Sequence, residues 1–459
     1  MSPNSNPQAL THILVLKFLE NHNYTSALEA FRQEAKEIID EEQDNEQINE
    51  PLTTIIQDYL FNQLRSNVEN ISLERSIDDY LITPGDNKFP RYLCESFPQI
   101  HNNNILCVRT QTLPIRNFSD GEYQFSEIPT IITGSADKSI RLTSLLTGDT
   151  FNVCNNIHKG GILCMDFHPN YHRLVLTGSM DSTCALINIT TLDVLQTFKD
   201  HLKYVVRARF SIDGNMIVTA SYDHTINIYK VVNDESNPIL SPTSPYTPLT
   251  PSTPNTPLPK YNKIHSTRFG GNIESMCFLP DNQYLVVGVR GDNYLHYINL
   301  TNFSDKKYNM NSNGDDWVSF TPMDISSSPR NRGKYLLVST DDDNGRIILF
   351  RTHSSQQIYN FYDLEVIPNR KLTNPRHCWH PNGKYFFTFG VDSFIRVYDV
   401  TTKSIVHKLI GHKDIVRDIW FDQDRDLLIS CGFDKTVKIW SVDDTTNQNS
   451  NSNSQLNGN

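Results

Sequence analysis

Three residues near the end of the chain are of the types that carry out nucleophilic catalysis. They are His412, Ser430 and Asp434, and a serine, a histidine and an aspartate serve as nucleophile, base and orienting acid in serine hydrolases. Ser430, however, stands in the run Leu427–Trp440, where apolar residues alternate on both sides of an Asp-containing turn. Such a run predicts two core strands joined by a tight turn. We therefore interpret the serine hydroxyl as a structural group and not as a nucleophile.

Other reactive side chains do not form recognisable sites. The eight cysteines, at positions 94, 107, 154, 164, 184, 277, 378 and 431, lie at least ten residues apart. No CxxC pair predicts a metal or redox site, and we expect reduced, mostly buried thiols. A phosphate-binding loop, a metal-ligand cluster and a nucleophile elbow are all missing from the sequence. We expect no cofactor, no metal, no catalytic residue and no small-molecule substrate.

The composition restricts the class of partner. The chain has 459 residues, 38% apolar and 20% charged, with a net charge of −11, and so part of it is expected to lie outside a packed core. An acidic chain lacks the charge to neutralise phosphates, which argues against direct binding of nucleic acid. The polar start and the absence of any run of about 18 apolar residues predict a soluble protein of the cytoplasm, the nucleus or both, without a membrane partner.

A strand–turn–strand pattern recurs along most of the chain. The turn positions are 137, 181, 223, 292, 344, 392 and 434, which gives gaps of 44, 42, 69, 52, 48 and 42 residues. The largest gap holds a polar, Pro-rich stretch of 27 residues (233–259), and its removal leaves 42. Several short strands in a unit of about 42 residues are typical of one propeller blade. The prediction is an all-β, seven-bladed β-propeller with a small N-terminal helical region.

These repeats resemble those of the WD-repeat family over residues 91–442. In that family a Gly-His pair precedes the first strand of a repeat, and here Gly411-His412 precedes Asp434 at the same spacing at which His201 precedes Asp223. The resemblance implies a structural hydrogen-bond tetrad of His412, Ser430, Asp434 and Trp440 in the last blade. Other blades depart from the pattern, because the position of the tryptophan is taken by Thr143, Ile187, Tyr229, Ile298, Phe350 and Tyr398, and the fourth to sixth blades lack the histidine.

Closure of the ring requires a partner for the last sheet, because an open ring leaves an unpaired strand edge. In WD-repeat proteins, the segment before the first repeat supplies that outer strand. Residues 91–100 stand in the corresponding place. The polar tail, residues 443–459, is then not needed for closure and is expected to be disordered.

Residues 8–38 follow helical spacing and resemble a LisH motif. Two short helices with a break near Tyr24 are predicted, and the LisH resemblance implies a homodimer, because such short helices cannot bury their apolar faces alone. The alternative is that they dock on the propeller. Residues 39–90 are expected to be an acidic linker with an amphipathic helix at 53–68. The dimerisation candidates are Leu14, Phe18, Leu19, Tyr24, Ala27 and Phe31.

Residues 232–260 form an insertion that contains six Ser/Thr-Pro pairs at an unbroken period of three. Polyproline II also has three residues per turn, so the six hydroxyls would share one face and proline-directed kinases could load that face with charge. The alternative is low-complexity drift in a tolerated, disordered loop. The phosphorylation candidates are Ser241, Ser244, Thr247, Thr250, Thr253 and Thr256.

A rigid ring with variable loops favours recognition over catalysis. We expect a non-catalytic scaffold or adaptor that dimerises through its N-terminal helices and belongs to a multiprotein regulatory complex. The alternatives are a substrate-recognition subunit of a ubiquitin ligase and, more remotely, an enzyme or small-molecule-binding propeller that uses the central channel. The candidates for partner contact, taken as exposed large residues on the face of the histidine loops, are Tyr204, Tyr222, Trp317, Arg376 and Phe433.

Overall fold

The computed structural model describes residues 15–16, 19–20, 24–34, 81, 83–119, 122–232, 258–342, 345–362 and 374–443. It divides into two compact units, residues 1–83 and 84–459, and each is considered by itself. The predicted helix at 53–68, the six Ser/Thr-Pro pairs and the tail beyond residue 443 lie outside the described residues.

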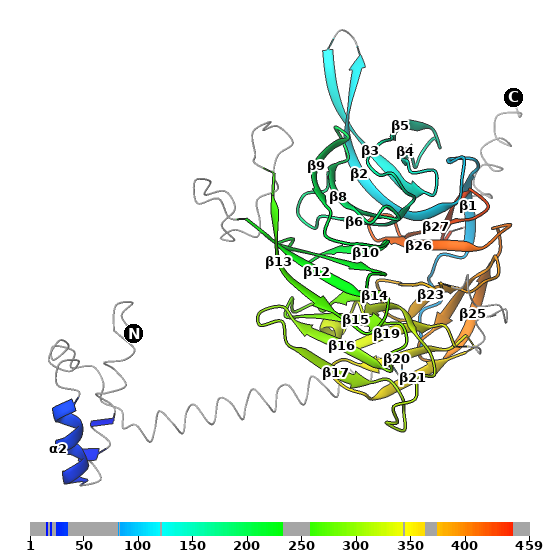
Figure 1. The fold of residues 1–459 in the computed structure, drawn as a ribbon. Coiled ribbons are helices and arrows are strands. Elements are labelled where there is room, and N and C mark those ends of the chain that lie inside the picture. The colour runs from blue at the N-terminus through cyan, green and yellow to red at the C-terminus, as the bar shows by residue number, and fades with distance from the viewer. Residues whose placement is uncertain are drawn as a thin grey trace, which may run out of the picture. The chain divides into compact units, whose positions relative to one another are not determined.

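The larger unit consists of seven four-stranded antiparallel sheets (Figure 1). This confirms the seven-bladed β-propeller. Blade 1 contains β2 (Ile105–Ser119), β3 (Glu122–Ser135), β4 (Ile140–Ser144) and β5 (Thr150–Cys154). Blade 2 contains β6 (Ile162–Phe167), β7 (Leu174–Ser179), β8 (Cys184–Asn188) and β9 (Asp193–Phe198). Blade 3 contains β10 (Val205–Phe210), β11 (Met216–Ser221), β12 (Thr225–Val231) and β13 (Tyr261–Arg268).

The remaining blades repeat the arrangement. Blade 4 contains β14 (Ile273–Phe278), β15 (Tyr284–Val289), β16 (Tyr294–Asn299) and β17 (Asp305–Asn309). Blade 5 contains β18 (Pro322–Ser327), a 3-10 turn (Asn331–Gly333), β19 (Tyr335–Thr340), β20 (Ile347–Arg351) and β21 (Gln357–Phe361). Blade 6 contains β22 (His377–Trp379), β23 (Tyr385–Phe389), β24 (Ile395–Asp399) and β25 (Ser404–Leu409). Blade 7 contains β26 (Val416–Asp422), β27 (Leu427–Gly432), β28 (Val437–Ser441) and β1 (Tyr92–Phe97).

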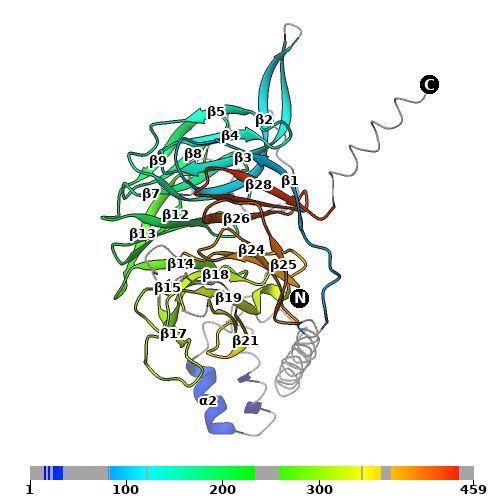
Figure 2. The ribbon, with the colours of Figure 1, turned by 90° about the vertical axis from the view of Figure 1, so that its right-hand side faces the viewer.

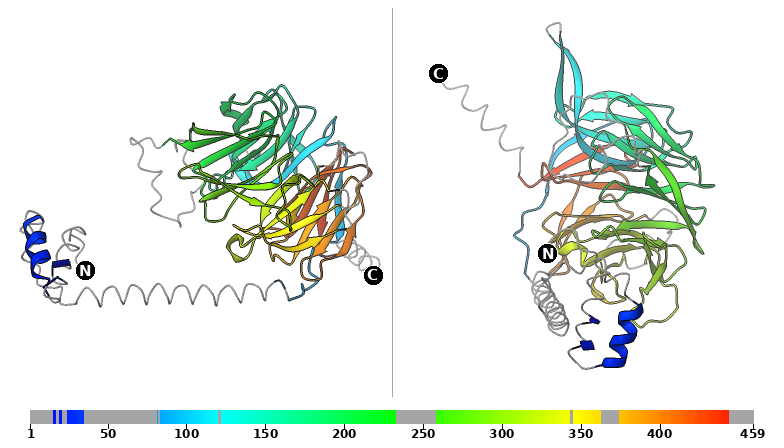
Figure 3. Two further views of the ribbon diagram at one scale, coloured as in Figure 1. Left: turned by 60° about the horizontal axis from the view of Figure 1, so that its bottom comes forward. Right: turned by 90° about the vertical axis from the view of Figure 1, so that its left-hand side faces the viewer.

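The first strand of each blade is the innermost one. Each of the strands β2, β6, β10, β14, β18, β22 and β26 contacts the first strands of the two neighbouring blades, so that the seven strands form a complete ring (Figure 3). The second and third strands of a blade are almost fully buried between sheets, whereas an outer strand such as β9 is largely exposed. The ring of inner strands therefore lines the central channel.

The ring closes through a strand from the start of the propeller. Strand β1 pairs antiparallel with β28, with Tyr92 opposite Ser441 and Phe97 opposite Val437 (Figure 2). This pairing confirms the prediction that residues 91–100 supply the outer strand of the last blade. The seventh sheet thus gains its fourth strand from the opposite end of the domain.

The two insertions leave the ring at different places. In blade 1, β2 and β3 continue as one long hairpin, which stands out from the ring (Figure 1). The Pro-rich insertion joins β12 to β13 at the Val231 end of β12, opposite to the end that carries Thr225 and the turn at Asp223. It therefore joins the face opposite to the histidine loops.

The smaller unit contains helix α2 (Thr25–Glu34). Residues 15–16 and 19–20 are also helical, and Tyr24 donates its backbone N–H to the carbonyl of Leu19. Tyr24 and Ala27 are exposed, Leu19 and Phe31 are half-buried, and Leu14 and Phe18 lie outside the described residues. Helical structure is thus present in this segment, and the LisH motif and the dimer both stay predictions.

A chain of hydrogen bonds holds the start of blade 7. The indole N–H of Trp440 donates to Ser430 Oγ (2.9 Å), the Ser430 hydroxyl donates to His412 Nε2 (2.8 Å), and His412 Nδ1–H donates to Asp434 Oδ2 (2.9 Å). Burial alone would raise the pKa of Asp434, but the hydrogen bonds from His412 and the Lys413 N–H hold it below its usual value. The Ser430 hydroxyl is buried between the indole and the imidazole, as a structural group would be.

Blades 1, 2 and 3 use the same arrangement without the indole. A threonine replaces the serine, and the histidine lies between this hydroxyl and the turn aspartate. The triplets are His101, Thr133 and Asp137; His158, Thr177 and Asp181; and His201, Thr219 and Asp223.

In blades 4 and 6 the turn aspartate finds its cation in the strand that follows it. Asp292 Oδ2 lies 3.0 Å from His296 Nε2, and Asp392 accepts two hydrogen bonds from Arg396, of 2.8 and 2.7 Å. The missing loop histidine is thus replaced by a residue four positions beyond the aspartate. Sequence reasoning did not predict these pairs, although the spacing could have indicated them.

We expect Ser430→Ala to destabilise the protein by about 1–3 kcal/mol, because it leaves the Trp440 indole N–H and the His412 ring nitrogen buried without a partner. Ser430→Thr is the matched control, since the equivalent positions of blades 1 to 3 carry threonine. Chemical unfolding of the three proteins measures the difference. Equal losses for alanine and threonine would show that shape, and not the hydroxyl, matters at this position.

For His296 we predict a pH effect of the opposite sign to that of His101, His158 and His201. Both ring nitrogens face carboxylates, Asp292 at 3.0 Å and Asp305 at 2.8 Å, so both must donate and the ring carries a proton. Burial lowers the pKa of His296, but these two hydrogen bonds outweigh it and raise the pKa above its ordinary value. The resulting stabilisation is complete below about pH 6.5 and disappears as the pH rises through the raised pKa.

His296→Gln should therefore cost about 2 kcal/mol in slightly acidic buffer and progressively less in alkaline buffer. Unfolding free energies of the two proteins across this range give the difference. Both proteins contain His101, His158 and His201, so the effects of these three histidines on the unfolding free energy cancel in the difference. Burial lowers the pKa of each of these three, so each destabilises the fold as the pH falls. A difference that grows with pH would contradict a protonated His296.

Candidate functional site

Most inner strands carry an irregularity at their first residues, beside the histidine loops. In six of them the pairing register shifts at the second residue, which is the extra residue of a β-bulge, and such bulges re-aim a side chain at a sheet rim. The equivalent positions lie at one level of the ring because the strands are arranged alike. The bulge residues are Leu106, Leu163, Val206, Glu274, Met323 and Arg417.

A second set of side chains follows the second strand of each blade. In each of six blades a residue there donates its backbone N–H to a carbonyl just before an inner strand, over 2.8 to 3.2 Å. This bond holds the residue beside the bulge residues, on the face that carries the histidine loops. We call this face the His-loop face. The residues are Ala136, Met180, Tyr222, Arg290, Asp341 and Phe433.

One half of the His-loop face is apolar. Leu106, Leu163 and Val206 form a cluster against which Ala136, Tyr222 and Phe433 pack. Met180 and Tyr204 extend the apolar surface, Tyr204 being 49% exposed, and Leu202 beside them is 86% exposed. We call the side chains of these nine residues the apolar sector. It covers the rim from blade 7 to blade 3.

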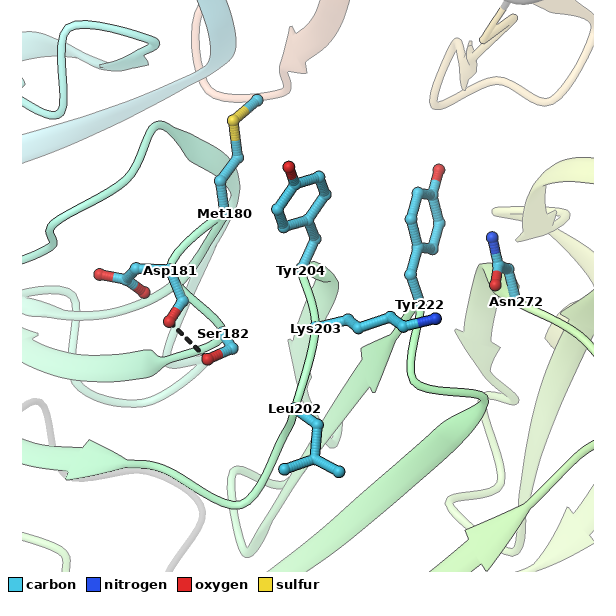
Figure 4. Close-up of a pocket in the computed structure, with 8 residues that line it drawn as sticks. All are labelled: Met180, Asp181, Ser182, Leu202, Lys203, Tyr204, Tyr222 and Asn272. Atoms are coloured by element: carbon cyan, nitrogen blue, oxygen red, sulfur yellow. Dashed lines mark hydrogen bonds between the residues drawn. The ribbon is translucent and has the colours of Figure 1, made fainter.

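A shallow depression of about 450 Å³ lies partly in the apolar sector and is lined by polar residues as well (Figure 4). It is lined by Met180, Asp181, Ser182, Leu202, Lys203, Tyr204, Tyr222 and Asn272. The side chains of Met180, Tyr204 and Tyr222 point the same way, and the two tyrosine ring centroids are 6.4 Å apart. Aromatic and methionine side chains on a rigid rim are typical of protein-binding surfaces.

The other half of the rim is charged and internally paired. Arg290 donates to Glu274 Oε1 (2.7 Å) and lies 3.5 Å from Asp341, while the Tyr222 hydroxyl donates to Glu274 Oε2 (3.0 Å). Burial and the neighbouring Glu274 raise the pKa of Tyr222 to about 12. Tyr222 thus joins the apolar sector to the charged half through its hydroxyl.

Buried carboxylates within the ring bind the backbone of the next blade. Asp418 accepts from the N–H of Val108 (3.1 Å), Asp324 from that of His377 (3.1 Å), and Asp166 from that of Phe210 (2.9 Å). Burial would raise the pKa of Asp418, but two arginines hold it at about 2. These charges therefore couple neighbouring blades.

Arginines from the inner strands neutralise these carboxylates. Asp418 is shared by Arg109 (2.8 Å) and Arg376 (2.9 Å), Asp166 pairs with Arg209 (3.1 Å), and Asp324 lies 3.6 Å from Arg207. Four arginines thus face three aspartates in this part of the ring. Burial and the proximity of Arg376 lower the pKa of Arg207 to about 10.

The structure brings three of the five contact candidates together. Tyr204, Tyr222 and Phe433 lie in the apolar sector. Trp317 is 75% exposed in the connection between β17 and β18, on blades that do not carry this sector. Arg376 differs from the expectation of an exposed residue, because it is only 6% exposed and its side chain forms the ion pair with Asp418.

Sequence reasoning missed several contributors to this face. Leu202 directly follows the tetrad histidine His201, and its place in that loop could have indicated exposure. The bulge residues carried no such signal, because the strand register decides which residue a bulge displaces. In the part of the chain that the structure describes, no group of three His, Cys, Asp or Glu side chains could hold a metal ion. Burial raises the pKa of the Cys107 thiol to about 12, so this cysteine is inert.

No helix among the described residues is long and apolar enough to cross a membrane. A family model described as WD domain, G-beta repeat matches residues 152–188, 192–230, 376–399 and 403–441. Three of these matches begin at the outer strand of one blade and end at the third strand of the next. Each sequence repeat therefore bridges two blades.

Similar proteins include protein tipD of Dictyostelium discoideum, 31% identical over 24% of this chain, and a striatin homolog of the same organism, 21% identical over 63%. The human U5 small nuclear ribonucleoprotein 40 kDa protein is 30% identical over 15% of this chain. The matches cover 19%, 35% and 19% of those three proteins, in the same order. Taken together with the seven-bladed ring, the matches show that this chain contains WD40 repeats.

Proposed function

We propose that this protein is a non-catalytic scaffold that binds protein partners through the apolar sector of its His-loop face. The observation that carries the proposal is the apolar cluster of Leu106, Leu163 and Val206, with Leu202 and Tyr204 exposed beside it. Exposed apolar patches on a rigid frame mark interaction sites. The other half of the same rim is paired internally and offers fewer free groups.

The comparisons support a role within an assembly. The human U5 40 kDa protein is by name a protein of a small nuclear ribonucleoprotein, and we infer that this chain is likewise a subunit of a multiprotein complex. The buried, paired charges of the channel favour a structural interior over a reaction centre, because no described acid or histidine there is free to act as a general acid or base.

Leu202→Glu combined with Tyr204→Ala should reduce partner capture at least about tenfold, because both changes remove the most exposed apolar side chains of the proposed contact. Leu146→Glu is the matched control. Leu146 is 74% exposed in the turn between β4 and β5, at the opposite face of the ring. Quantitative affinity capture and thermal unfolding of the three proteins separate lost binding from lost folding. Undiminished capture by the double variant would refute the assignment of this face.

We also propose that residues 8–38 join two copies of the chain. Support comes from the helical residues and from the half-buried positions of Leu19 and Phe31. The Ser/Thr-Pro pairs from Ser241 to Thr256 are proposed targets of proline-directed kinases, which would place negative charge beside blade 3.

A homodimer of this 52.7 kDa chain should sediment at twice the monomer mass, and Phe31→Glu should return it to the monomer, because a charge in an apolar helix contact is unfavourable. Glu29→Gln, at an exposed position of α2, is the control. Analytical ultracentrifugation of the full chain tests both variants. A wild-type monomer would overturn the dimer.

A further inference from the structure

Trp317 is the most exposed aromatic side chain in the described part of the chain, with 75% of its surface in solvent. It stands in the connection between β17 and β18, and Val318 beside it is also exposed. The chain has four tryptophans, and the other three are packed: Trp440 is almost fully buried, and Trp379 and Trp420 are half-buried in inner strands. Tryptophan is among the residues that contribute most to protein contacts, so this uncovered indole calls for a partner.

The backbone of Trp317 is held on both sides, although its side chain is exposed. Asp315 Oδ1 accepts from the Trp317 N–H (3.3 Å), and Asn311 Nδ2 donates to the Trp317 carbonyl (2.6 Å). The side-chain amides of Asn309 and Asn293 both donate to the carbonyl of Asp315 (2.8 and 3.2 Å), which fastens the loop to the end of β17 and to the turn before β16. A group that is ordered before it binds loses less entropy on binding. The indole is therefore presented by a rigid loop.

Two exposed carboxylates stand beside the indole without an ion-pair partner. Asp315 accepts hydrogen bonds from the side-chain amides of Asn311 and Asn313 (2.7 and 2.5 Å), and Asp316 Oδ1 accepts from the Tyr294 hydroxyl (2.6 Å). All of these donors are neutral. Among the residues that the structure describes, no lysine, arginine or histidine forms an ion pair with either aspartate. The loop thus carries negative charge that remains available to a partner.

The basic residues of blade 4 do not neutralise this loop. Lys306 Nζ lies 5.1 Å from the centre of the Tyr308 ring, and Lys307 stands opposite His296 in the sheet. Arg290 forms its ion pairs at the rim of the channel. The charge of Asp315 and Asp316 is therefore not cancelled by a direct contact within the described part of the chain.

We propose that the loop of residues 311–318 binds a basic segment of a partner protein, with an arginine guanidinium over the Trp317 indole and paired with Asp316. A guanidinium is planar, so it can stack on an aromatic face while its N–H groups bind a carboxylate. The proposal goes beyond the proposed function. The loop is fastened to β16 and β17, the two outer strands of blade 4, whereas the apolar sector covers the rim from blade 7 to blade 3.

The carboxylates decide between a basic segment and other partners. An apolar pocket would accept the indole, but it would also bury Asp315 and Asp316 without a cation, which is unfavourable. A nucleic acid or an anionic membrane surface would be repelled by both aspartates. A basic segment satisfies the ring and the charges together, and the net charge of −11 favours the approach of a positively charged partner.

The test uses the full chain and the heptapeptides Gly-Ser-Xaa-Gly-Xaa-Ser-Gly, in which Xaa is arginine, lysine or citrulline. Citrulline has nearly the shape of arginine but no charge. Because the peptides contain no aromatic residue, tryptophan fluorescence reports on the protein alone, and acrylamide in the free protein quenches mainly the exposed Trp317. In low-salt buffer, millimolar arginine peptide should lower the quenching constant at least about twofold, because the guanidinium covers the indole. The lysine peptide should have a smaller effect and the citrulline peptide none.

Substitutions test the two halves of the site separately, with the anisotropy of a fluorescein-labelled arginine peptide as the readout. Trp317→Leu should weaken binding at least about fivefold, because leucine keeps the apolar surface but has no ring for a cation. Asp316→Asn should have a similar effect, and it retains the oxygen that accepts from the Tyr294 hydroxyl. Asp281→Asn is the matched control and should bind as wild type does. Asp281 is an exposed aspartate at the opposite end of blade 4, and its Oδ1 likewise accepts a hydrogen bond, from the Gln283 N–H (2.9 Å).

Three results would overturn the inference. Equal shielding of the indole by the arginine and citrulline peptides would show that charge is not recognised. Equal weakening by Asp316→Asn and Asp281→Asn would show a general attraction to an acidic chain. Full binding by Trp317→Leu would show that the ring is not part of the site. None of these results bears on partner capture through Leu202 and Tyr204, so the proposed function would stand without this second contact.

Discussion

The structure of the propeller depends on the pairing of β1 with β28, which joins residues more than three hundred positions apart in the chain. The last sheet of the ring takes its outer strand from the start of the domain. Without this strand, the edge of β28 would remain unpaired. With this pairing, Trp440 of β28 is covered by blade 7 and by blade 6, where it packs in one core cluster with Phe387 and Phe389. The closing strand therefore stabilises the tetrad as well as the ring.

An aspartate occupies the turn of each blade that carries a tetrad or its substitute, but the side chain that donates a hydrogen bond to it changes. A loop histidine serves in blades 1, 2, 3 and 7, His296 in blade 4 and Arg396 in blade 6. A carboxylate in a tight turn needs hydrogen-bond donors. A donor from the loop and a donor from the following strand serve equally well if they lie within hydrogen-bond distance. This explains how blades that lack the histidine still form the same turn.

The features that repeat from blade to blade could be predicted from the sequence. The features in which single blades differ could not. The spacing of His412 and Asp434 reappears at His201 and Asp223, and so the blade count, the closing strand and the tetrad could be predicted. Exposure at the rim could not, because it depends on a one-residue shift in each inner strand. Arg376 shows the difficulty. In blade 7 the bulge residue Arg417 faces the mouth and the next residue, Asp418, faces inward. Arg376 is the counterpart of Asp418, and it is buried against that aspartate.

The charged side chains of the inner strands differ in what they contribute to the ring. Asp166, Asp324 and Asp418 each receive both an arginine and a backbone N–H of the next blade, so their burial is compensated twice. Arg417 is half-buried, and within the described part of the chain its terminal nitrogens face an amide oxygen, that of Asn374. The charges that hold the ring together are therefore those whose carboxylates also bind the backbone of the next blade.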